Sequence, residues 1–162
     1  SRGLGDVYKR QGKKELAKIP IFGFFYKKLV IMVDRSNPES RKRVYEMAKR
    51  RLKNGMSIGI FPEGLVPNEN VVLAPFKNGA FSLAIEHQIQ IIPQVYYDCK
   101  RLFSWNFFKG GPGIFRVKQC NFINTKGLKK SDLDDLKDKV FSLIYNNLIG
   151  DKNYMNRDFK TN

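Results

Sequence analysis

The sequence carries Ile60-Phe61-Pro62-Glu63-Gly64 at the end of an apolar run over residues 56–60. The run is typical of a buried strand, and Pro62 would end it because proline has no N–H to donate to a neighbouring strand. Gly64 allows a sharp turn or the close approach of a ligand to the backbone. We therefore expect Glu63 at the carboxyl end of a strand, where open α/β sheets bind their ligands. On these residues alone, the alternative is a strand-ending turn with a solvated glutamate.

Strands and helices are expected to alternate along the rest of the chain. Strands are predicted at residues 30–34, 56–60, 90–97 and 114–120, and helices from Pro38 to the turn at Gly55, over residues 78–87, and from Ser131 to Gly150. The second helix would bury Phe81, Ala84 and Ile85. This order predicts an α/β sandwich with a mixed, centrally parallel sheet flanked by helices.

The helix ends carry local signals. Pro38 suits the first turn of a helix because its missing N–H is not needed there, and Gly55 suits a helix end. Ser131 and Asp134 have the spacing of a capping box for the last helix, which Gly150 would end.

Composition favours one globular domain, since 162 residues with 42% hydrophobic content can bury a sizeable core. The net charge of +15 is concentrated in residues 1–60, which hold 16 Lys and Arg against 5 Asp and Glu. Such a charge suggests phosphate-rich partners, either nucleic acid or an anionic membrane surface. Cys99 and Cys120 have no metal-type spacing, so neither a metal nor a cofactor is expected. No run of about 18 apolar residues indicates a membrane-spanning helix.

Four further segments accompany the Phe-Pro-Glu-Gly motif in a fixed order: residues 19–28, 30–37, 75–80 and 91–95. In this order they resemble the lysophosphatidic acid acyltransferase family (1-acylglycerol-3-phosphate O-acyltransferases). That family carries a His-x4-Asp motif, an apolar block ending in arginine, the Phe-Pro-Glu-Gly motif and an apolar block with proline. The last three are matched here over residues 13–95, and the resemblance implies a glycerolipid acyltransferase-like fold.

The first motif of the family is missing. The only histidine, His87, has no aspartate five residues after it, and a helix-terminal structural role is expected for it. We therefore expect a fragment whose acyltransferase domain covers residues 13–150 in part. Residues 1–12 are expected to be non-native, or else a basic disordered N-terminus, and residues 151–162 are expected to be a C-terminal tail.

The resemblance implies acyl transfer from acyl-CoA or an acyl carrier protein to the free hydroxyl of 1-acylglycerol-3-phosphate. In the family the motif histidine acts as general base, so no catalytic residue is expected within this chain. Four residues match acceptor- or phosphate-binding positions of the family: Arg35, Glu63, Gly64 and Lys77. Arg35 can instead form a surface ion pair with Asp34 or Glu39, and Lys77 can be an ordinary exposed lysine.

The chain also departs from the family pattern. Residues 65–67 read Leu-Val-Pro where the family commonly has Thr-Arg-Ser, so another lyso-lipid, such as a lyso-ornithine lipid, is an alternative acceptor. A different class is a non-enzymatic basic module that binds nucleic acid through residues 41–53, which explains the charge but not the order of motifs, so nucleic acid is not the expected partner. Ser57 and Ser104 lack the context of a serine hydrolase nucleophile.

Two aromatic segments could lie at a membrane. The rings of residues 22–26 stand beside Lys27 and Lys28, which suits the headgroup boundary, although they could equally be core. Residues 103–109 could contact membrane or an acyl chain, although packing within a hairpin is favoured for them. With the lipid acceptor, this predicts a peripheral or monotopic protein on the cytoplasmic face of the membrane.

The missing motif predicts that the purified 162-residue chain is catalytically inactive. Removal of a positioned acid–base group typically lowers the rate about 10²–10⁴-fold. Release of free thiol from acyl-CoA in the presence of 1-acylglycerol-3-phosphate measures this. Turnover at the rate of an intact family enzyme would refute the assignment of the general base to the absent motif.

Overall fold

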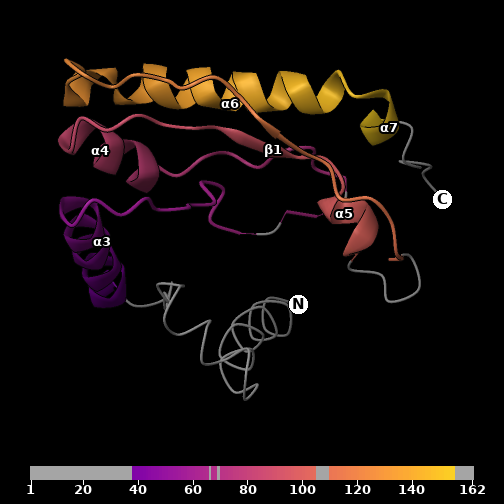
Figure 1. Cartoon of the computed structure of the whole chain (residues 1–162), viewed down its shortest axis with the longest axis horizontal. Helices are drawn as coiled ribbons and strands as arrows, with labels where there is room; N and C mark the ends of the chain where they lie inside the picture. The colour runs from indigo at the N-terminus through magenta and orange to yellow at the C-terminus, as the bar shows by residue number, and fades with distance from the viewer. Residues whose placement is uncertain (1–37, 66, 69, 105–109, 156–162) are drawn as a thin grey trace. The chain divides into compact units, whose positions relative to one another are not determined.

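The computed structural model describes residues 38–65, 67–68, 70–104 and 110–155 (Figure 1). The chain divides into two compact units, residues 1–59 and residues 60–162. Each is described by itself. The predicted boundaries at residues 12 and 150 stay predictions.

The described part of the first unit, residues 38–59, contains the helix α3, Pro38–Lys53. It begins at the predicted proline, and Gly55 follows its end with φ of 74°, a conformation that glycine adopts without strain. Glu39 lies in the first turn and Arg50, Arg51 and Lys53 lie in the last, so both ends carry charges that suit the helix dipole.

The strand predicted over residues 56–60 is not formed. The Met56 N–H donates to Arg51 O at 3.0 Å, so the backbone here closes the helix instead of joining a ladder. Met56 and Ile60 are 47% and 44% exposed, which a buried strand would not allow. The predicted strand over residues 30–34 lies outside the described residues.

The second unit contains one long helix and several short elements. In chain order they are α4 (Gly79–Glu86), β1 (Gln94–Tyr96), α5 (Cys99–Leu102), β2 (Val117–Gln119), a 3₁₀ turn (Lys130–Asp132), α6 (Leu133–Ile149) and α7 (Lys152–Met155). Helix α6 runs along the unit and packs against both α4 and β1 (Figure 1).

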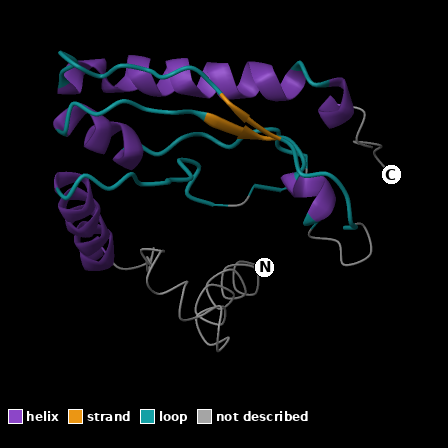
Figure 2. Cartoon of the chain, viewed as in Figure 1, coloured by secondary structure: helices purple, strands orange, loops and turns teal. Residues whose placement is uncertain are grey.

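The described residues combine helices with a small sheet, as the predicted α/β class requires, but they do not show the predicted central parallel sheet. Strands β1 and β2 pair antiparallel, with Val95 opposite Lys118 and Tyr96 opposite Val117, and an isolated bridge joins Ile91 to Ile123 (Figure 2). Helix α5, Cys99–Leu102, lies between the two strands in the sequence. The predicted spans at residues 90–97 and 114–120 are right in place but too long.

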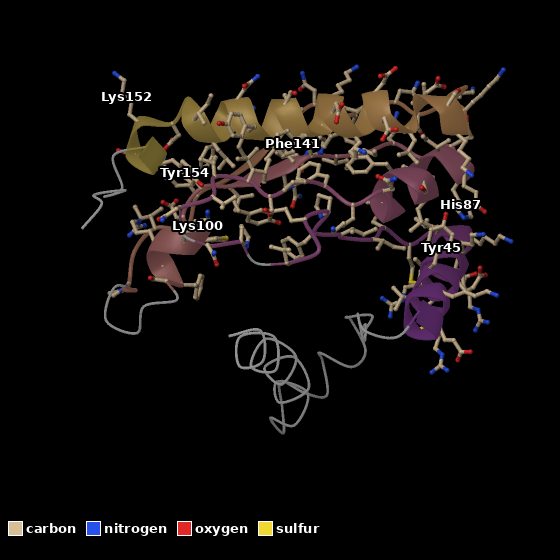
Figure 3. The ribbon with its side chains drawn as sticks, turned by 180° about the vertical axis from the view of Figure 1, so that it is seen from behind. Tyr45, His87, Lys100, Phe141, Lys152 and Tyr154 are labelled. Atoms are coloured by element: carbon tan, nitrogen blue, oxygen red, sulfur yellow. The ribbon has the colours of Figure 1, made fainter. Side chains whose placement is uncertain are left out.

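The main core lies between α4 and α6. Phe81, Ala84 and Ile85 of α4 are buried as predicted. Phe76 stacks on Phe81 with ring centroids 6.0 Å apart and meets the ring of Phe141 edge-on at 5.1 Å. Phe141, on α6, is labelled in Figure 3. The apolar stripe of α6 therefore docks the helix as its periodicity predicts.

A second hydrophobic cluster lies at the other end of the unit. Val95, Cys120, Leu148 and Tyr154 are packed together and buried. Tyr154, on α7, lies within the predicted C-terminal tail and is 3% exposed. Its hydroxyl donates to Val72 O at 3.2 Å. Figure 3 shows Tyr154 and Lys100 at the same end of the unit, away from His87.

The start of α6 differs from the predicted capping box. The Asp132 carboxylate accepts a hydrogen bond from the Lys129 N–H at 2.6 Å, and Ser131 Oγ contacts Asp132 Oδ1 at 3.2 Å. The box is thus formed by Lys129 and Asp132, two residues earlier than the predicted pair, because the chain enters the helix through a 3₁₀ turn. The predicted end is confirmed, since α6 stops at Ile149 with Gly150 as its C-cap.

An ionic cluster is formed by Arg116, Asp98 and Asp151. Arg116 directly precedes β2, Asp98 directly precedes α5, and Asp151 follows the end of α6. Arg116 Nε donates to Asp98 Oδ2 at 2.9 Å, and its Nη1 donates to Asp151 Oδ2 at 2.8 Å. The Asp98 carboxylate is only 3% exposed. The hydrogen bonds that Arg116 donates to Asp98 and Asp151 raise the pKa of Arg116, and the Arg116 guanidinium lowers the pKa of the Asp151 carboxyl. Both charges are thus held in their ionised forms.

Candidate functional site

The Phe-Pro-Glu-Gly motif forms a tight turn. The Gly64 N–H donates to Phe61 O at 3.1 Å, and Pro62 occupies the second turn position, which its fixed φ favours. Gly64 has φ of 70°, where a residue with a Cβ would be strained. The alternative stated above, a turn, is therefore right for the backbone, but Glu63 is not simply solvated.

Lys77 is held against this turn. Its N–H donates to Pro62 O at 2.7 Å. A Cβ placed on Gly64 would lie 3.3 Å from Lys77 Cγ, so the absence of a side chain at Gly64 gives the lysine stem its room. Lys77 is exposed and stands two residues before the first residue of α4. Lys77 thus directly precedes Asn78, the N-cap of α4.

Glu63 fixes the neighbouring backbone. Its Oε2 accepts a hydrogen bond from the Ala74 N–H at 2.7 Å. Burial raises the pKa of the Glu63 carboxyl, while the bond from Ala74 and the charge of Lys100 oppose that rise. The carboxylate and the Pro62 carbonyl therefore join the turn to the segment 74–77 at two points.

Lys100 was not singled out by the sequence. Its Nζ donates to the backbone carbonyls of Asn68, at 3.3 Å, and Val71. These hydrogen bonds hold the loop that leads to Ala74. Lys100 also places a positive charge near Glu63. A lysine on a short helix after an apolar strand has no local signal that predicts this role, because its partners lie about thirty residues earlier.

Three of the four predicted site residues are therefore neighbours: Glu63, Gly64 and Lys77. Arg35 lies outside the described residues. Their role in binding an acceptor stays a prediction. No group of acidic, histidine or cysteine residues in the described ranges has the arrangement of a metal site.

His87 lies at the C-terminal end of α4, where its N–H donates to Leu83 O at 3.0 Å. This is the helix-terminal place that the sequence predicts for it. Its Nε2 atom is buried, with no hydrogen-bond partner among the described residues. Of the predicted aromatic segment, Phe103 is described and is 76% exposed, whereas residues 105–109 lie outside the description.

The family described as Acyltransferase matches residues 5–97, more than half of the chain, and includes the whole turn and Lys77. The chain belongs to this acyltransferase family. Residues 5–12, predicted to be non-native, fall within the matched range, and that prediction stays open.

Individual relatives of this acyltransferase agree with the family match. A 1-acyl-sn-glycerol-3-phosphate acyltransferase of Haemophilus influenzae is 34% identical over 77% of the chain and 52% of its own length. The human 1-acyl-sn-glycerol-3-phosphate acyltransferase beta is 31% identical over 78% of the chain and 46% of its own length. An acyltransferase of Schizosaccharomyces pombe is 31% identical over 91% and 54%.

The chain spans about half the length of these relatives. No solved structure matches it. Within the described ranges, none of the chain's helices is both long and apolar enough to cross a bilayer.

The raised pKa of Glu63 gives the stability of the chain a testable pH dependence. The folded chain binds this proton more tightly than the unfolded chain, so the stabilisation is fully present below the ordinary value of 4.5 and is lost as the pH rises through the raised pKa. Glu63→Gln keeps an oxygen acceptor for Ala74 but does not titrate. We expect the melting temperature of the native chain, relative to that of Glu63→Gln, to fall as the pH rises above 4.5 and through the raised pKa. A difference that stays constant with pH would contradict this.

Proposed function

We propose that this chain forms the acceptor-binding part of an acyltransferase. The enzyme would move an acyl chain from acyl-CoA or an acyl carrier protein to the free hydroxyl of 1-acylglycerol-3-phosphate. Membership of the acyltransferase family supports the reaction, and the names of the Haemophilus and human relatives support this acceptor. We place the enzyme at the cytoplasmic face of a membrane, as a peripheral or monotopic protein.

The observation that carries the proposal is the joining of the Phe-Pro-Glu-Gly turn to Lys77. The Lys77 backbone is fixed by the Pro62 carbonyl at 2.7 Å, while its stem passes over Gly64. A lysine ammonium is a compact point charge that can bind a phosphate oxygen. Glu63 is engaged with the backbone, since its Oε2 accepts the Ala74 N–H at 2.7 Å. In this arrangement Glu63 shapes the loop and Lys77 binds the acceptor phosphate.

The chain's own residues thus orient the acceptor. A lysophospholipid whose phosphate is held at Lys77 has only limited freedom to turn its glycerol hydroxyl. Such positioning lowers the entropic part of the barrier to acyl transfer. The thioester donor supplies the activated acyl group, and proton removal from the hydroxyl falls to the histidine motif that the resemblance implies.

Binding of a short-chain, water-soluble 1-acylglycerol-3-phosphate to the purified chain tests this proposal. Lys77→Ala is expected to weaken binding about tenfold, the size of one partly solvated charged hydrogen bond. Lys126→Ala changes an exposed lysine elsewhere in the unit and should have no effect. Calorimetric titration gives both affinities. Equal affinities for the native chain and Lys77→Ala would refute a phosphate contact at Lys77.

Glycine substitutions separate backbone strain from the lysine contact. Gly64 and Gly127 both have positive φ, 70° and 84°, but only at Gly64 would a Cβ meet a neighbour, Lys77. Gly64→Ala and Gly127→Ala should therefore cost similar stability, about 1 kcal/mol. Only Gly64→Ala should also weaken acceptor binding.

A second acceptor class is favoured by one observation. Leu65, 45% exposed, begins the Leu-Val-Pro sequence that replaces the family's Thr-Arg-Ser, so a cation expected near the phosphate is absent from that position. A lyso-ornithine lipid has no phosphate. The same titration decides between the two, because binding that is unaffected when the phosphate is removed from the ligand supports the phosphate-free acceptor.

A further inference from the structure

The loop between the Phe-Pro-Glu-Gly turn and Ala74 makes a tight turn of its own. The Val71 N–H donates to Asn68 O at 3.1 Å, and the Lys100 ammonium donates to the same oxygen at 3.3 Å and also to Val71 O. One side chain thus bonds both ends of this turn. Because Lys100 follows Val71 by 29 residues in the sequence, the contact fixes the turn against a separate element, α5, on which Lys100 is labelled in Figure 3.

The position of this turn limits the position of Ala74. Ala74 follows Val71 by three residues, so the backbone between them can span no more than about 10–11 Å. The Ala74 N–H donates to Glu63 Oε2 at 2.7 Å, and Ala74 is 6% exposed. A buried N–H that lost its partner would destabilise the fold, so the loop must bring Ala74 to the Glu63 carboxylate. Lys100 therefore acts on one end of a short segment whose other end bonds Glu63.

Helix α5 holds Lys100 in place. The helix is only four residues long, but the Leu102 N–H donates to Asp98 O at 2.9 Å, and Arg116 donates to the buried Asp98 carboxylate. The start of α5 is therefore anchored in the ionic cluster. Lys100 is the second residue of this helix and is half-buried, so its ammonium reaches the loop from a fixed backbone.

Lys100 influences Glu63 in two ways. Burial raises the pKa of the Glu63 carboxyl, and the Ala74 hydrogen bond and the charge of Lys100 both lower it. The charge acts directly, whereas the hydrogen bond depends on where the loop places Ala74. Both favour the ionised carboxylate, which accepts a stronger hydrogen bond than the neutral acid. Removal of Lys100 should therefore weaken both effects that oppose burial.

We propose that Lys100 is a positioning residue for the candidate site. It holds the loop so that the Ala74 N–H meets the Glu63 carboxylate. Glu63 then fixes the turn that sets Gly64 beside the Lys77 stem. Lys100 donates to the loop carbonyls, so it acts through Glu63 and does not bind the acceptor. The inference rests on the proposed function in one respect, namely that a phosphate-bearing acceptor binds at Lys77, whereas the effect on Glu63 requires no acceptor.

Acceptor affinity gives the first test. Lys100→Met keeps a stem of similar length but removes the charge and the donors. Its affinity for a short-chain 1-acylglycerol-3-phosphate should fall roughly two- to thirtyfold, the range usual for residues that act on a site without contacting its ligand. Lys100→Arg keeps a cation with several donors and should restore most of the affinity.

The chain offers a matched control. Lys118 also donates to a neutral oxygen, Asn147 Oδ1, at 2.7 Å in the same unit, so Lys118→Met should bind the acceptor like the native chain. Equal affinities of Lys100→Met and Lys118→Met would overturn the proposal.

NMR titration without acceptor gives a readout that a merely structural role would not change. In the native chain the Ala74 amide resonance should shift with the titration of Glu63, because the two groups are hydrogen-bonded. In Lys100→Met the pKa of Glu63 should rise further, and the Ala74 resonance should no longer follow it. An Ala74 resonance that still follows Glu63 in this variant would overturn the proposal, because Lys100 would then act through its charge alone. The same changes in Lys118→Met would also overturn it.

The native chain supplies a readout that does not depend on the folding of a variant. The Lys100 Cε resonance should shift as Glu63 ionises, since the lysine charge lies near the carboxylate. The Lys118 Cε resonance should not shift at that pH. Equal behaviour of the two lysines would contradict the proposal.

A double-variant cycle shows whether Lys100 acts through Glu63. Glu63→Ala removes the acceptor of the Ala74 hydrogen bond, so adding Lys100→Met should cause no further loss of acceptor affinity. Independent residues give additive losses, and additive losses here would overturn the proposal. If the native chain bound no acceptor, the proposed function would fail, while the titration of Glu63 and Ala74 would still decide the role of Lys100. Failure of that titration would leave the Lys77 contact untouched.

Discussion

Replacement of Asp98 by alanine is expected to remove a large part of the stability of the second unit. The Asp98 carboxylate, 3% exposed, accepts hydrogen bonds from the Arg116 backbone N–H and from Nε, both at 2.9 Å. Loss of one partner from a buried ionic cluster typically costs about 3–5 kcal/mol, against a total of about 5–15 kcal/mol for a domain. Urea denaturation followed by circular dichroism measures the loss.

An exposed ion pair provides the control. Asp134, 75% exposed, contacts Lys137 at 2.5 Å on α6. Asp134→Ala should change stability by less than about 1 kcal/mol, as exposed pairs do. If both alanine variants unfold at the same urea concentration, Asp98 does not contribute the predicted share of the free energy of unfolding.

Arg35→Lys is expected to lower kcat/KM for a phosphate-bearing acceptor about tenfold to a hundredfold. The assay uses an enzyme in which this chain is joined to the family's histidine motif. A guanidinium binds phosphate through two parallel hydrogen bonds, which an ammonium does not reproduce, and a charged hydrogen bond is worth about 1.5–3 kcal/mol. Initial rates with acceptor and donor both varied give the separate constants.

The donor constant serves as the internal control for Arg35. Because the thioester does not depend on this contact, its KM should stay nearly unchanged in Arg35→Lys. A variant whose acceptor and donor constants both equal those of the native enzyme would make Arg35 a surface residue and remove it from the site.

Helices were predictable because their signals are local. Pro38 and Gly55 bracket α3, and Gly150 follows the last residue of α6, since each end depends on a few adjacent residues. Ser131 was misassigned for the same reason: the sequence offers two similar caps, and the bond between Lys129 and Asp132 decides between them.

Strands were less predictable because pairing is not local. An apolar run such as residues 56–60 does not say which backbone lies beside it, and here Met56 bonds back to the helix. The ionic cluster was missed because Arg116 lies 18 residues from Asp98 and 35 from Asp151. A signal existed, since Asp98 is the single acid among the basic residues of 94–119.

The residues of the candidate site could be predicted from the sequence, but the contacts between them could not. Family motifs identified Glu63, Gly64 and Lys77, and the structure adds that Glu63 bonds the Ala74 backbone while Gly64 makes room for Lys77. These are contacts between side chains and backbone across a loop, which motif spacing does not encode. Lys100 could not be found for the same reason.

The bond between Tyr154 and Val72 bears on how the protein should be produced. Val72 lies two residues before Ala74, which donates a hydrogen bond to Glu63. Hydrogen bonds to Tyr154 and to Glu63 therefore both stabilise this loop. A shortened version ending at Gly150 would lack both Tyr154 and Asp151. Recombinant versions should therefore extend through Met155. Amide exchange at residues 72–74 would report on the loss of either hydrogen bond.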